Sequence, residues 1–196
     1  SSMRRNVLDR ADQDLDRGAS VFAQLLEMRG AQLSESVQLA ARDFAFREAV
    51  ASGDQATVQS VLVNHGGRIN ANFALLIQPD GMVSASTTGA IATAHPFPFG
   101  ELLGHAGNHR LFATVAALDG RAYQVVLAPV LAPRRIGWVS MGFALDAAAL
   151  AKLHELTGLE ISLAVSHQSG TTQWLSTLPA TERDQYRHCS ECHMAI

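Results

Sequence analysis

The sequence predicts an α+β fold in which a long N-terminal helix is followed by an antiparallel sheet with flanking helices. Three observations predict it. Apolar residues recur every three or four positions through the first fifty residues, which is the helical period. From residue 73 the period changes to two, and Asp-Gly turns separate the alternating segments. Short helical patterns interrupt these strands without the regular strand–helix alternation that a parallel sheet needs.

The first fifty residues are predicted to form one long helix with an apolar stripe. The stripe consists of Leu8, Ala11, Leu15, Ala19, Phe22, Leu26, Leu33, Val37, Ala40 and Phe44. A helix of roughly forty residues is about 60 Å long, which is more than a compact domain of this size needs. We therefore expect it to project from the globule and to join two copies of the chain as a homodimer. The alternative is two ordinary helices that are broken near Gly30.

A second, shorter helix is predicted after the break at Ser52-Gly53. Asp54 is a suitable N-cap because its carboxylate can accept a hydrogen bond from the first turn. The helix is expected to run to Asn64 and to end at Gly66-Gly67, since glycine commonly ends helices.

Two hairpins follow in the sequence. Phe73–Gln78 and Met82–Ser86 flank Pro79-Asp80-Gly81, and Leu111–Leu118 and Arg121–Val130 flank Asp119-Gly120. The long connection between the hairpins, from Thr88 to Asn108, holds a short helix at Glu101–His105.

The C-terminal third adds three strands and two helices. Pro129 and Pro133 are predicted to end a strand and to form a turn, because proline cannot donate a ladder hydrogen bond. The elements expected after them are a strand at Ile136–Leu145, a helix at Ala147–Leu156 capped by Asp146, strands at Glu160–Ser166 and Gln173–Thr177, and a helix at Ala180–Tyr186.

Composition excludes several classes of protein. Fifteen Lys and Arg against eighteen Asp and Glu give a net charge of −3, so no basic surface for nucleic acid is expected. Two cysteines in 196 residues exclude a small fold built on disulfides. No apolar run approaches the roughly 20 residues that span a bilayer. No motif with a nucleophile and base or with a catalytic metal pair supports an enzyme.

Several segments resemble Cache-type sensor domains. The segment from Arg42 to Asp54 resembles the one that opens these domains. The segments Ala74–Ile77, Asp80–Ser86, Leu118–Gln124, Ile136–Phe143 and Leu156–Glu160 keep the family's order. The match covers roughly residues 35–180, and it is most similar to the Cache domains that precede diguanylate cyclase (GGDEF) and phosphodiesterase (EAL) output domains in bacteria.

This resemblance implies a PAS-like sheet and a periplasmic sensor of a small-molecule ligand. It divides the chain into a signalling and dimerisation helix over residues 1–53, a sensor domain over 54–180 and a tail over 181–196. It implies attachment to the inner membrane through transmembrane segments outside this chain, which is therefore expected to be a fragment. The long helix would relay a stimulus to a cytoplasmic output such as cyclic-di-GMP turnover.

Alternate residues of two strands are candidates for the ligand pocket. Tyr123 shares a strand face with Val125 and Leu127, and Trp138 shares one with Ser140 and Gly142. Polar groups for orienting a ligand are Ser84, Ser86, Thr87 and Gln124. The resemblance favours Tyr123 and the loop aromatics Phe97 and Phe99 near the ligand. The alternative is that Tyr123 and Trp138 are ordinary core residues.

Arg68 precedes the first strand and is a further candidate. In a Cache pocket an arginine can clamp a carboxylate with two hydrogen bonds. The alternative is an exposed arginine that forms a surface ion pair.

The chain ends with the motif C-x-x-C-H, formed by Cys189, Cys192 and His193. In c-type haem attachment, two thiols add to the haem vinyl groups and the adjacent histidine binds the iron. The alternative function is therefore a redox or gas sensor with c-type haem. The alternatives are a local disulfide, a free thiol pair or a zinc ion bound by Cys189, Cys192 and a histidine.

Overall fold

The computed structural model describes residues 2–106, 112–166 and 172–179. The chain divides into two compact units. The sheet unit comprises residues 1–116 and 123–144, and the hairpin unit comprises 117–122 and 145–196. Each unit is described by itself.

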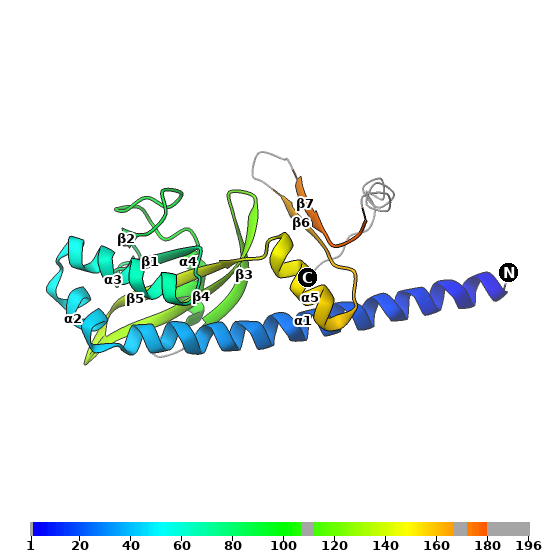
Figure 1. Ribbon diagram of the computed structural model, residues 1–196, viewed down its shortest axis with the longest axis horizontal. Helices are drawn as coiled ribbons and strands as arrows, with labels where there is room; N and C mark the ends of the chain where they lie inside the picture. The colour runs from blue at the N-terminus through cyan, green and yellow to red at the C-terminus, as the bar shows by residue number, and fades with distance from the viewer. Residues whose placement is uncertain (1, 107–111, 167–171, 180–196) are drawn as a thin grey trace. The chain divides into compact units, whose positions relative to one another are not determined.

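The sheet unit begins with α1, a single helix over Ser2–Arg42 (Figure 1). The predicted long helix is thus confirmed, and the alternative of a break at Gly30 is wrong. The helix nevertheless ends eight residues earlier than expected. The carboxylate of Asp43 accepts a hydrogen bond from the backbone N–H of Phe46 at 2.9 Å and so caps a separate helix, α2 (Phe44–Ser52). Among the described residues, none of the helices combines the length and apolar character that crossing a membrane requires.

Helix α3 (Gln55–Arg68) starts where the sequence predicts. The carboxylate of Asp54 accepts hydrogen bonds from the backbone N–H and from the hydroxyl of Thr57. The predicted end at Gly66-Gly67 is wrong, because both glycines lie inside the helix. Gly66 is buried, and a side chain there would begin 3.4 Å from the Cβ of Ala74. At this position α3 therefore packs against β1 at an ordinary contact distance.

Five strands form an antiparallel sheet in the order β2-β1-β5-β4-β3. Their bounds are β1 Phe73–Ile77, β2 Val83–Ser86, β3 Phe112–Leu118, β4 Arg121–Ala132 and β5 Arg134–Ala144. A short helix, α4 (Gly100–Ala106), precedes β3. The α+β class, both hairpins and the short helix between them are confirmed.

The expectation that Pro129 ends a strand is wrong. It lies inside β4, where it pairs with Trp138 of β5. β4 has twelve residues and β3 seven, so the end of β4 extends past the start of its hairpin partner. A proline has no N–H, so it is tolerated in a strand at a position that does not donate to the ladder.

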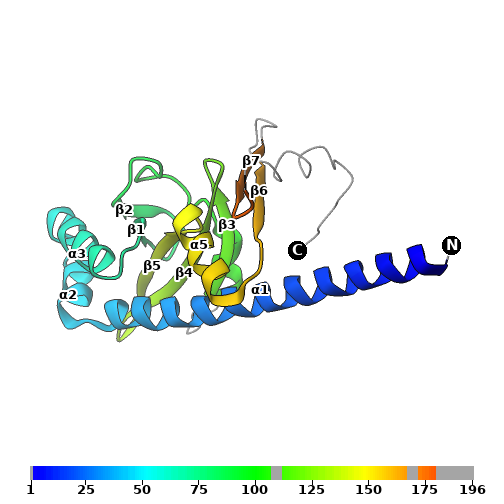
Figure 2. The same cartoon turned by 45° about the vertical axis from the view of Figure 1, so that its right-hand side comes forward.

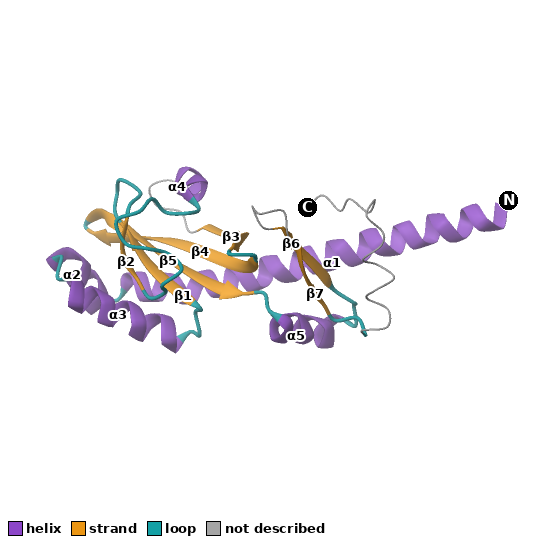
Figure 3. Cartoon of the chain, turned by 90° about the horizontal axis from the view of Figure 1, so that it is seen from above, coloured by secondary structure: helices purple, strands orange, loops and turns teal. Residues whose placement is uncertain are grey.

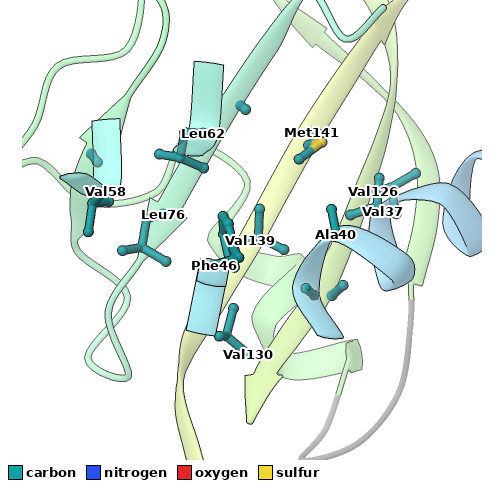
Figure 4. Packing of buried hydrophobic residues seen from close by; sticks show 14 of the residues in the cluster. Val37, Ala40, Phe46, Val58, Leu62, Leu76, Val126, Val130, Val139 and Met141 are labelled. Atoms are coloured by element: carbon teal, nitrogen blue, oxygen red, sulfur yellow. The ribbon is translucent and has the colours of Figure 1, made fainter. Parts of the chain in front are cut away.

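The two faces of the sheet are covered differently. One face packs against α1, α2 and α3 through an apolar cluster that includes Val37, Phe46, Leu62, Val126 and Met141 (Figure 4). The helix α4 lies on the other side of the sheet from α2 and α3 (Figure 3). We call that second side the loop-covered face. Its strand residues, which include Leu75, Leu127 and Ser140, alternate along the strands with those of the apolar cluster.

The hairpin unit contains a helix and a two-stranded sheet. Helix α5 (Ala147–Thr157) is capped by Asp146, as predicted, and it ends at Gly158, which has the left-handed conformation. Strands β6 (Ser162–Ser166) and β7 (Thr172–Ser176) pair antiparallel and run side by side (Figure 2). The helix predicted at 180–186 lies outside the described residues.

Candidate functional site

The strand pairing brings three of the predicted site residues to the loop-covered face. Leu127 of β4 pairs with Ser140 of β5, and Pro129 pairs with Trp138. Tyr123 lies on the same side of β4 as Leu127 because residues separated by an even number share a face. The structure therefore places Tyr123, Trp138 and Ser140 on one face of the sheet.

Ser140 is the most unusual of these residues. It is fully buried, and its hydroxyl has no hydrogen-bond partner among the residues that the structure describes. Its cross-strand neighbours are Leu75 on β1 and Leu127 on β4, which are also fully buried and offer no polar side-chain atom. A buried hydroxyl without a partner costs about 1–3 kcal/mol. The site is thus a polar group in an apolar setting.

Trp138 lies near a positive charge. The guanidinium carbon of Arg135 lies 4.8 Å from the centre of the indole ring, which is a cation–π distance. The sequence analysis missed Arg135 because a strictly alternating strand would put it on the opposite face from Trp138. A bulge at Ile136 shifts the register, so that Leu131 pairs with Arg135 and Val130 with Gly137.

Tyr123 packs edge to face against Phe73 at 5.4 Å between ring centres. Phe73 pairs with Gly142 across β1 and β5. A side chain on Gly142 would overlap the phenyl ring. Phe73 was also missed in the sequence, although a glycine inside a strand signals a close approach of this kind.

Ser86 of β2 and Ser140 of β5 lie on either side of Leu75 of β1. Ser86 pairs with Leu75, and Leu75 pairs with Ser140. The Ser86 hydroxyl donates to the carbonyl of Thr88 at 2.8 Å, so its proton already has an acceptor within the protein. Ser84 likewise donates to the carbonyl of Leu76 at 3.2 Å.

Phe97 and Phe99 lie in the segment between β2 and α4. Their rings meet edge to face at 5.4 Å, and Phe97 is almost completely buried. The backbone N–H of Phe97 donates to the carbonyl of Gly81 at 2.9 Å, which holds the segment against the β1–β2 turn.

Two predicted residues lie away from this face. Arg68 is exposed in the last turn of α3, one of the helices on the opposite side of the sheet. Its charge is the smallest of the contributions that lower the pKa of Asp43, of which the hydrogen bond from the backbone N–H of Phe46 is the largest. Gln124 also points to the helix side, where its amide contacts α1. The structure does not bring either residue together with Trp138 and Ser140.

A separate groove lies between α1 and β3 on the helix side of the sheet. It encloses about 360 Å³. Its lining comes from Leu26, Glu27, Gly30, Ala31 and Ser34 of α1, from Ala113, Thr114 and Val115 of β3, and from Gln124.

The C-x-x-C-H residues Cys189, Cys192 and His193 lie outside the described residues. Within the ranges that the structure does describe, no three His, Cys, Asp or Glu side chains gather into a possible metal site.

The strand order, with helices packed on one face of an antiparallel sheet, defines a PAS-like α+β fold. The chain belongs to the dCache_3 family, the double sensory domain of two-component sensor kinases, whose family model matches residues 9–191. The family is sensory and is not itself catalytic. No curated protein sequence matches the chain.

Three solved structures with a similar fold are described here. The periplasmic domain of Vibrio cholerae LuxQ is 14% identical, with a TM-score of 0.59, over 83% of this chain and 78% of that one. The sensor domain of the V. cholerae histidine kinase DctB is 16% identical, with a TM-score of 0.57, over 93% and 76%. A domain of a putative sensory box/GGDEF family protein from Vibrio parahaemolyticus is 8% identical, with a TM-score of 0.53, over 70% and 61%.

Proposed function

We propose that this chain is the periplasmic ligand-binding module of a bacterial transmembrane signalling protein and that its ligand binds at the loop-covered face. The observation that carries the proposal is the buried, unpaired hydroxyl of Ser140. Ligand pockets are mostly apolar with a few polar groups that orient the ligand. Ser140 between Leu75 and Leu127, with Trp138 on the same strand, has that character.

A thermal-shift screen with amino acids, organic acids and polyamines tests this proposal. A ligand at 100 times its dissociation constant stabilises the folded state by about 2.7 kcal/mol, so binding raises the melting temperature. Ser140→Ala is expected to weaken the binding of an active compound roughly tenfold, the effect of one lost hydrogen bond. Ser84→Ala is the matched control, because the Ser84 hydroxyl already has a backbone partner.

Two outcomes contradict the proposal. In one, no compound of the screen shifts the melting temperature. In the other, an active compound binds Ser140→Ala as tightly as it binds the unchanged chain. The second result would place the ligand elsewhere on the domain.

The signal is proposed to leave the domain through α1 and to control a cytoplasmic output such as cyclic-di-GMP turnover. The support is the length of α1, which is about 60 Å for its 41 residues, and the family's sensory role. A ligand changes such an output only if it binds the two conformations of the sensor with different affinity. Measuring cyclic-di-GMP in cells that express the longer protein, with and without an active compound, tests the output.

The C-x-x-C-H motif supports a second candidate function, a sensor with c-type haem. Production in the periplasm with the haem-attachment machinery would then give a Soret band that is lost in Cys189→Ala. A colourless protein under those conditions rules this function out.

A further inference from the structure

Helix α1 meets the sheet through two kinds of contact. Near its C-terminal end, Val37, Ala40 and Ala41 are buried in the apolar cluster that covers β4 and β5 (Figure 4). Apolar packing is non-directional, so by itself it does not fix the position of a helix along its axis. Further towards the N-terminus, the contact is polar and comes from Gln124 of β4.

Gln124 is 3% exposed, and one turn of α1 satisfies both ends of its amide. Its Nε2 donates to the carbonyl of Leu26 at 2.7 Å, and its Oε1 accepts from Nη1 of Arg29 at 2.7 Å. Hydrogen bonds require a narrow range of distance and angle. These two bonds therefore fix the position of α1 along its axis relative to β4.

Gly30 lies at this contact. It is buried within α1, and a Cβ there would lie 3.7 Å from Nε2 of Gln124 and 3.4 Å from the Cβ of Ala113. The backbone of α1 thus lies directly against the amide of Gln124, with no side chain between them.

The neighbours of Gln124 along β4 point to the other side of the sheet. Val125 pairs with Gly142, and Leu127 pairs with Ser140 on the loop-covered face. Any shift of β4 caused by a molecule on that face moves Gln124 with it, because they share one stretch of backbone.

We propose that Gln124 is the positioning residue that couples β4 to α1, so that a change on the loop-covered face reaches α1 through the Gln124 amide. This proposal rests on the proposed function for its signalling role. The coupling itself can be tested without a ligand, so its failure is distinguishable from a failure of the ligand screen.

Hydrogen exchange of the full chain, resolved along α1, provides the first test. Gln124→Leu keeps the size of the side chain and removes both hydrogen bonds. Exchange at residues 26–33 is expected to rise about tenfold, while residues 37–41 stay protected by the apolar cluster. Gln59→Leu is the matched control, because Gln59 donates to the carbonyl of Ser86 from α3 and makes no such bond to α1.

A double-mutant cycle provides the second test. Val125→Ala changes the loop-covered face and is expected to raise exchange at residues 26–33 when Gln124 is present. In the Gln124→Leu background, it is expected to add no further change there. Ile77→Ala is the control on the same face, since β1 is separated from β4 by β5.

Three results would overturn the proposal. One is unchanged exchange at residues 26–33 in Gln124→Leu. Another is a rise of equal size in α1 and throughout the sheet, which would mean a general loss of stability. The third is an effect of Val125→Ala that is the same with and without Gln124.

Discussion

The ring of Phe73 lies across Gly142, in the space that a side chain at position 142 would need. The two residues face each other on adjacent strands, and the same ring also meets Tyr123. Gly142 therefore sets how the aromatic residues are arranged beside the candidate ligand site.

Gly142→Ala is expected to destabilise the domain by about 1–3 kcal/mol, because a methyl group overpacks a filled core. Chemical denaturation measures this loss. Phe73→Leu in the same chain should restore part of it by removing the ring edge. A destabilisation that Phe73→Leu does not relieve would mean that the overlap with the ring is not its cause.

Gly30→Ala is expected to stabilise the domain by up to about 1 kcal/mol, since alanine is a better helix former than glycine. The added methyl would lie 3.4 Å from the Cβ of Ala113, which is an ordinary contact distance. Denaturation of Gly67→Ala is the comparison, because Gly67 is exposed within α3 and a Cβ there meets nothing within 4 Å. A gain for Gly67→Ala with a loss for Gly30→Ala would show that α1 cannot accept a methyl against β3.

Asp54→Asn is expected to reduce the loss of stability in acid. Hydrogen bonds from the hydroxyl and the backbone N–H of Thr57 lower the pKa of the Asp54 carboxylate in the folded state. Its stabilisation is therefore present above the unfolded pKa of about 3.9 and is lost as the pH falls through the lower folded value. Asparagine caps a helix well but does not titrate in this range.

Denaturation between pH 3 and pH 7 checks this expectation. The stability of Asp54→Asn should change little at pH 7 and should fall less steeply below pH 5 than that of the unchanged chain. An identical acid slope in both proteins would assign the loss to other carboxylates.

The homodimer through α1 is a proposal, and the burial of the residues on α1 decides which of them should be changed to test it. Val37 and Ala40 of the predicted stripe are buried against the sheet, and Phe44 belongs to α2. Val21 and Met28 are exposed on α1, at 42% and 69%, and lie seven residues apart on one face of the helix.

Val21→Glu is expected to weaken a dimer that forms through α1, which sedimentation velocity over a range of concentrations would detect. Val63→Glu is the control, because Val63 is similarly exposed but lies on α3. A strictly monomeric chain at high concentration would contradict the proposal.

Local patterns predicted most of the elements, because their signals lie within a few residues. The caps at Asp54 and Asp146 and the turns at Asp80-Gly81 and Asp119-Gly120 depend only on neighbouring atoms. The wrong predictions concern positions whose secondary structure depends on contacts with residues far away in sequence. Gly66 stays helical because it packs against β1.

The candidate site also divides into features that local patterns predict and features that depend on tertiary contacts. Period-two alternation groups Trp138 with Ser140 within β5, and the pairing of β4 with β5 puts Tyr123 on the same side of the sheet. The bulge that brings Arg135 beside Trp138 is a property of strand pairing, and no single-strand pattern contains it. The direction of Gln124 follows from the same alternation, but its partner on α1 lies almost a hundred residues away in sequence.

The alternation along β4 has an evolutionary consequence. Residues that face the loop-covered side and residues that face α1 are neighbours in the chain, yet they meet different surroundings. With the ligand at the proposed site, substitutions at Val125 or Leu127 are expected to alter recognition, while Gln124 and Val126 keep their contacts on the helix side. A strand of this kind would allow a lineage of sensor domains to acquire new specificities and to retain an inherited output.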